Sequence, residues 1–192
     1  MNKKFLKALA LVGCALLLVT ASVVGTYAVL TSQTGTITNT FTSGNVKITM
    51  DEAKVDLYGV KVGNTRVSDK NEYKLIPGHK YTKDPTIYVD ENSESCWLFV
   101  KVENGIAEIE GGTKIADQLV TNGWTALAGE DNVYYHAIAD KNATVKVFES
   151  FTIKTDANVD AFKTAEIAVT AYAVQAEGFD TPDAAWDAAK FS

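Results

Sequence analysis

The chain has 192 residues, with 18 basic and 24 acidic side chains and a net charge of −6. This length fits one domain that buries roughly two-thirds of the surface exposed by its unfolded chain. An acidic surface repels phosphate groups, so the composition argues against nucleic acid and anionic lipid as partners.

Residues 1–28 have the pattern of an export signal. Three lysines precede an apolar run over residues 8–24, and a small-residue cleavage pattern follows, with Thr26 at −3 and Ala28 at −1. Cleavage after Ala28 leaves 15 basic against 24 acidic residues, a net charge near −9. An uncleaved anchor and lipidation at Cys14 are the alternatives, but the apolar run continues well past Cys14, which a lipoprotein signal does not need. We therefore expect contact with a membrane only before cleavage.

Residues 29–44 follow the cleavage point and carry no charge. The segment is rich in threonine and contains no proline, so it favours an extended conformation and lacks the usual defences against pairing with another chain. We interpret it as an assembly strand whose contact residues are Val29, Leu30, Ile37, Asn39 and Phe41. Thr34-Gly35 interrupts it. The alternative is an ordinary first strand of its own domain, or a leader without a partner.

Residues 45–192 form the predicted β-sandwich domain. The alternation of Val46, Ile48 and Met50 with polar residues predicts a half-buried strand, and Gly63-Asn64 predicts the turn of a following hairpin. Ile76-Pro77-Gly78 predicts a chain reversal.

The remaining pattern is dominated by short strands. Residues 96–103 are apolar on both faces, which predicts a central strand. Two short helices are expected, one over residues 114–120 with Thr113 as N-cap and one after Thr181-Pro182. Further strands are predicted over residues 86–90, 124–127, 133–139, 144–153 and 165–176. The fold class that this pattern predicts is all-β, an antiparallel jelly-roll or immunoglobulin-like sandwich with one or two short helices.

No pattern of a catalytic or cofactor site stands out. The two histidines, His79 and His136, are 57 residues apart and there is no HExxH motif. A zinc site assembled from both with Asp84 or Asp90 is the alternative, as is weak calcium binding by acidic loops. Cys96, the one thiol left after cleavage, is expected to be buried. We assign no catalytic residue, metal or cofactor.

Three stretches give the chain a resemblance to a known family. GTYA at residues 25–28 is followed by NTFTSGNVKITMDE at 39–52, and the later matches are KDPTIYVDENSESCWLFVKVE at 83–103 and AVTAYAVQAEGFDTPDAAWDAA at 168–189. In these features the chain resembles the TasA and camelysin family of exported Gram-positive proteins, which are released by the SipW type of signal peptidase.

The resemblance implies a jelly-roll-like sandwich, secreted to the extracellular matrix or cell surface of a Gram-positive bacterium. It also implies biofilm-matrix fibres, a homopolymer in which the N-terminal segment of one subunit completes a sheet of the next. Some members of the family are described as metalloproteases, so a camelysin-like protease is the alternative function. From the residues we expect the fibre protein without catalysis.

Overall fold

The computed structural model describes residues 31–34, 45–189 and 191. Every strand pairing in this part of the chain is antiparallel. The elements, in chain order, are β1 (Thr31–Thr34), β2 (Ile48–Val55), β3 (Lys61–Val67), β4 (Lys80–Thr82), β5 (Thr86–Val89), β6 (Cys96–Asn104), β7 (Glu110–Gly111), α2 (Ile115–Thr121), β8 (Thr125–Ala126), β9 (Val133–Ala139), β10 (Thr144–Lys146), β11 (Ser150–Ile153), the short 3₁₀ helix η1 (Val159–Phe162), β12 (Ile167–Gln175) and α3 (Pro182–Ala189).

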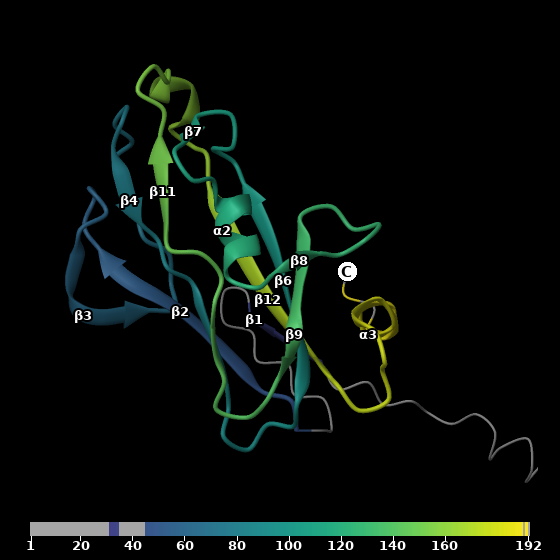
Figure 1. Ribbon diagram of the computed structural model, residues 1–192. Coiled ribbons are helices and arrows are strands. Elements are labelled where there is room, and N and C mark those ends of the chain that lie inside the picture. The colour runs from purple at the N-terminus through teal and green to yellow at the C-terminus, as the bar shows by residue number, and fades with distance from the viewer. Residues whose placement is uncertain (1–30, 35–44, 190, 192) are drawn as a thin grey trace, which may run out of the picture.

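The strands form three sheets in a sandwich-like arrangement. The largest has the order β1-β12-β6-β9-β8, the second β10-β5-β2-β3 and the smallest β4-β11-β7. In Figure 1, β12, β6 and β9 run through the middle of the molecule, with β2 and β3 on one side and α3 on the other. The predicted all-β, antiparallel class with two short α-helices is confirmed for the described residues.

The two apolar faces of residues 96–103 predicted a central strand. This prediction is confirmed, because β6 lies between β12 and β9. One face, with Leu98 and Val100, joins a core cluster that includes Ile87 of the second sheet and Phe151 of the third. The other face carries Phe99, which packs with Trp186 of α3 in a second cluster. The largest sheet is therefore covered on both faces, which is why β6 is apolar on both faces from Cys96 to Val100.

The hairpin between β2 and β3 does form, but the prediction that Gly63-Asn64 makes its turn is wrong. The turn lies at residues 56–59, where the Asp56 carboxylate accepts hydrogen bonds from the amides of Tyr58 at 2.9 Å and Val60 at 3.0 Å. Gly59 closes it with a φ of +75°, which favours glycine. Gly63 instead lies within β3, at the irregular part of its pairing with β2.

The expected helix at residues 114–120 is present as α2, but Thr113 is not its N-cap. The cap position is Lys114, which has no side-chain hydrogen bond to the helix. Glu110, buried on β7, accepts the free amide of Ile115 at 2.6 Å instead. A carboxylate from the preceding strand thus satisfies a donor that a capping residue usually takes.

The C-terminal prediction is confirmed in detail. α3 begins at Pro182, and the Thr181 hydroxyl accepts a hydrogen bond from the amide of Ala184 at 3.3 Å, as an N-cap does.

The predicted strand over residues 144–153 is two strands, β10 and β11, that belong to different sheets. None of the helices in the described ranges is long and apolar enough to cross a bilayer.

Candidate functional site: the β12 edge and its cavity

The described part of the predicted assembly segment, Thr31–Thr34, forms the edge strand β1 on β12 of the same chain. Thr31 lies opposite Val174 and Thr34 opposite Ala171, while β6 pairs with the other side of β12. β1 has only four residues and no charge. A short strand at a sheet edge is held by hydrogen bonds on one side only, so it separates from the sheet at a lower cost than the inner strands β12, β6 and β9.

The other residues singled out at this terminus lie outside the described residues: Thr26, Ala28, Val29, Leu30, Ile37, Asn39 and Phe41. Thr31–Thr34 pair with β12 of the same chain, which is the arrangement expected if the segment is an ordinary first strand of its own domain. Pairing between chains would use the same backbone groups of β12. The described register places Thr31–Thr34 against residues 171–174 of β12.

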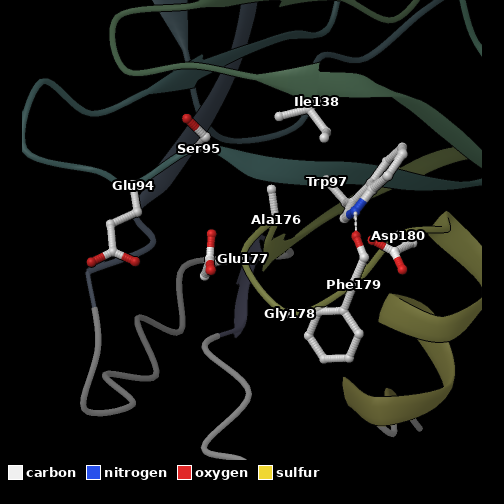
Figure 2. Close-up of a pocket in the computed structure, with 9 residues that line it drawn as sticks. All are labelled: Glu94, Ser95, Trp97, Ile138, Ala176, Glu177, Gly178, Phe179 and Asp180. Carbon is white, nitrogen blue, oxygen red and sulfur yellow. Dashed lines mark hydrogen bonds between the residues drawn. The ribbon is translucent and has the colours of Figure 1, made fainter.

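The β12 edge leads to a cavity of about 830 Å³ at the end of the largest sheet. It lies where β6 begins, where β9 ends and where the chain leaves β12, and Figure 2 shows the side chains around it. The residues that line it are Glu94, Ser95, Trp97, Ile138, Ala176, Glu177, Gly178, Phe179 and Asp180.

The cavity combines an apolar wall with acidic groups. The Trp97 Nε1 atom donates a hydrogen bond to the carbonyl oxygen of Phe179 at 3.3 Å, which fixes the loop after β12 against β6. Ile138 is 48% exposed, an unusual exposure for a large aliphatic residue. The charged residues of the lining are Glu94, Glu177 and Asp180. The arrangement suits a ligand with a small apolar body and a positive charge.

Sequence analysis did not find this cavity, because three separate segments contribute to it. Its apolar wall comes from β6, from the end of β9 and from the loop after β12. The one local signal was Glu177-Gly178, where Gly178 has a φ of +90° and turns the chain after β12. A turn signal alone does not reveal that two other strand ends lie beside it.

The two histidines lie in different parts of the fold and are engaged by neighbouring groups. His79 precedes β4, and its Nε2 atom lies 2.9 Å from the carbonyl oxygen of Tyr58. His136 is on β9, where its ring packs edge-on against Trp124 at 5.2 Å between centroids. In the described ranges there is no group of three or more histidine, cysteine or acidic residues that could hold a metal ion.

The acids considered as zinc partners are paired with cations. Asp84 accepts the Ala53 amide at 2.7 Å and contacts Lys61 at 3.2 Å and Arg66 at 3.3 Å. Burial acts to raise the pKa of Asp84, but these three partners together hold it below its usual value. Asp90 lies 3.0 Å from Lys47. Both carboxylates therefore stabilise the sheet that contains β2 and β5.

Cys96 is fully buried at the start of β6. Burial raises the pKa of its thiol to about 12, with a smaller effect from Asp140. The thiolate is the reactive form of cysteine, and a thiol with such a raised pKa is almost entirely protonated at neutral pH. Cys96 is therefore a buried structural residue of the core, and the prediction of its burial is confirmed.

Comparison of the chain with protein-family models, with curated proteins and with solved structures finds no match.

Proposed function

We propose that this protein is a secreted structural protein that forms extracellular fibres of the biofilm-matrix type, in which residues 29–44 of one copy pair with the sheet of the next. The observation that carries the proposal is the pairing of Thr31–Thr34 with β12 at the edge of the largest sheet. The export signal and the resemblance of the chain to the TasA and camelysin family support it.

The β1 pairing is suited to exchange between copies. β1 contributes main-chain hydrogen bonds along four residue pairs, and β12 would offer the same groups to a strand from another copy. Ten residues, 35–44, separate Thr34 from the next described residue, Asn45. A segment of this length spans up to about 35 Å when extended, enough to reach a neighbouring sheet.

Exchange of this kind generates a polymer. The donor segment and the acceptor edge are different surfaces of the molecule, so each contact is head-to-tail. A head-to-tail contact that does not close into a ring continues as a filament. Concentration then favours the exchanged form, because the pairing within one chain competes with identical pairings between chains.

Processing would control the start of assembly. While residues 1–28 remain attached, the apolar run over residues 8–24 holds the chain at the membrane. Cleavage after Ala28 by a SipW-type signal peptidase frees the segment that begins at Val29. The partner of the mature protein is then a second copy of itself, outside the cell.

The proposal is tested by finding out which chain supplies the strand. Ser32 lies opposite Ala173 in the β1–β12 register, a separation that a disulfide can bridge. Mature Ser32→Cys protein is mixed with Ala173→Cys protein under oxidising conditions, and the products are resolved on a non-reducing gel. Strand donation predicts covalent pairs that contain one copy of each variant.

A matched control uses Glu130→Cys in place of Ala173→Cys, because Glu130 is exposed on the loop between β8 and β9. Covalent pairs in the test mixture at no more than the control level, together with an absence of filaments in electron micrographs of the mature protein, would overturn the proposal. Cys96 does not interfere, since its buried thiol has a pKa of about 12.

A further inference from the structure

A lysine, a glutamate and an asparagine are hydrogen-bonded to one another against β2. Glu52 is a buried residue of β2. Its Oε2 atom accepts a hydrogen bond from the Lys83 Nζ atom at 2.8 Å, and its Oε1 atom accepts one from the Asn71 Nδ2 atom at 2.7 Å. Lys83 lies between β4 and β5, and Asn71 lies between β3 and β4. A single carboxylate thus holds a primary amine next to a carboxamide.

The group is largely shielded from water. The side chains of Lys83 and Glu52 are 12% and 8% exposed. Burial raises the pKa of the nearby Tyr73 hydroxyl, and the charge of Glu52 raises it further. A buried ion pair carries a large desolvation cost, and transfer of a proton from Lys83 to Glu52 removes both charges. The neutral amine that results is the nucleophilic form of lysine.

The amide of Asn71 is oriented as an electrophile. Its Oδ1 atom accepts a hydrogen bond from the backbone N–H of Val55 at 3.1 Å, and its Nδ2 atom also donates to the carbonyl oxygen of Ala53 at 3.0 Å. The Val55 N–H stabilises the negative charge that develops on Oδ1 when a nucleophile attacks Cγ. The amide therefore has a donor at its oxygen and the carboxylate of Glu52 at its leaving nitrogen.

We propose that Lys83 and Asn71 condense to an intramolecular isopeptide bond, with Glu52 as the proton carrier. The Nζ atom of Lys83 starts as an ammonium group, gives one proton to Glu52 and attacks Cγ of Asn71, which forms the new C–N bond. Glu52 passes this proton and a second one from Nζ to Nδ2. The Cγ–Nδ2 bond breaks, an ammonium ion leaves, and Glu52 ends as a carboxylate. The reaction needs no oxidant, cofactor or other reactant.

The bond would close a covalent loop around β4. It joins the segment before this strand to the segment after it, and β4 pairs with β11 in the smallest sheet. A closed loop leaves the unfolded chain with less conformational freedom, so the link stabilises the folded domain. The reaction requires only the folded chain, and it is therefore independent of whether the protein forms filaments.

A second asparagine–glutamate contact provides an internal comparison. The Asn104 Nδ2 atom donates to Glu110 Oε2 at 2.9 Å, as Asn71 does to Glu52. The other oxygen of Glu110 accepts the backbone amide of Ile115 at 2.6 Å, whereas that of Glu52 accepts a lysine. Because no amine is bonded to Glu110 in this described part of the chain, Asn104 should remain unlinked.

Mass spectrometry of the denatured mature protein, which begins at Val29, tests the proposal. We expect the main species to be lighter than its sequence mass by one molecule of ammonia. Trypsin does not cleave after a lysine whose amine is acylated. Digestion should therefore yield residues 71–74, joined through Asn71 to Lys83 of an uncleaved peptide that spans residues 81–101.

Three variants assign the roles, and circular dichroism confirms that each is folded. Lys83→Arg keeps a positive charge beside Glu52 but removes the amine, and Glu52→Gln keeps an acceptor for Asn71 but cannot carry protons. Both should have their full sequence mass. Lys61→Arg is the matched control, because Lys61 also pairs with a buried acid, Asp84 at 3.2 Å, and this variant should still lose one ammonia.

A wild-type mass equal to the sequence mass would overturn the inference. So would a loss of ammonia that persists in Lys83→Arg or in Glu52→Gln. An asparagine can also lose ammonia by closing onto its own backbone, so a lighter protein with no peptide linked through Lys83 would overturn the inference as well.

Discussion

The guanidinium Nη1 of Arg66 lies 3.3 Å from the Oδ2 atom of Asp84, and this contact connects the edge strand β3 to the segment that leads into β5. Arg66 also donates from Nε to Asp51 on β2 at 2.6 Å. β3 is otherwise largely exposed and irregularly paired. A group of charges, rather than apolar burial, therefore fixes this edge of the second sheet.

Replacing Asp84 with asparagine should lower the free energy of unfolding by about 2 kcal/mol, because it removes the countercharge of Arg66 and Lys61 while leaving an acceptor for the Ala53 amide. Urea denaturation at pH 7 measures the change. Asp90→Asn is the matched control, since that carboxylate pairs with Lys47 in an exposed position and its loss should have a much smaller effect.

The stability difference between wild type and Asp84→Asn should also depend on pH. The pKa of Asp84 is lower in the folded protein than its ordinary value of 3.8. The stabilisation is therefore present above that ordinary value and is lost as the pH falls through the lower, folded value. The stability difference between wild type and Asp84→Asn should shrink on acidification below about pH 4. A difference that stays constant down to pH 2 would contradict the assignment.

Glu110 should show the opposite dependence on pH. Burial raises its pKa above the ordinary 4.5, and the hydrogen bonds from the Ile115 amide and Asn104 only partly offset this effect. A raised carboxyl pKa means that the favourable contribution is present below 4.5 and is lost as the pH rises through the folded value. Relative to Glu110→Gln, the wild type should become less stable as the pH rises from about 4 to neutral. Thermal melts across that range test this, and a rising difference would contradict it.

The sequence was sufficient for elements whose signals are local. Thr181-Pro182 predicted the start of α3, and the two apolar faces of residues 96–103 predicted a central strand. It was insufficient where the deciding contact comes from a distant residue. The helix α2 is capped by Glu110 of β7, and Gly59 lies so close to Tyr81 that a Cβ atom would not fit there. The cavity needs three strand ends that no single stretch of sequence brings together.

The β2–β3 hairpin has two glycines at which the energetic cost of an alanine substitution has different causes, backbone conformation alone at one and backbone conformation with overpacking at the other. Gly59 and Gly63 both have a positive φ, +75° and +62°. A Cβ atom at Gly59 would lie 2.8 Å from the Cα atom of Tyr81, whereas one at Gly63 would meet nothing within 4 Å. Gly63→Ala should therefore cost about 1 kcal/mol for the left-handed backbone alone, and Gly59→Ala about 3 kcal/mol because overpacking is added.

Urea denaturation of the two glycine variants gives the comparison directly. Equal losses would show that the Gly59 turn can move away from Tyr81 without cost. A larger loss for Gly63→Ala would show that Gly63, and not Gly59, sets the geometry of the hairpin, as the sequence first indicated.

Filament formation should depend on the uncharged character of residues 29–44. Ile37→Lys places a charge inside the segment that we propose to be donated, and a charge buried between paired strands costs several kcal/mol unless it is paired. The mature variant should stay monomeric at concentrations at which the wild type forms filaments visible by electron microscopy. A circular dichroism spectrum equal to that of wild type shows that the variant is folded. Val120→Lys is the matched control, since Val120 is 67% exposed on α2, and this variant should assemble like wild type. Filaments from Ile37→Lys that equal those of wild type in amount and morphology would show that assembly uses another surface of the subunit.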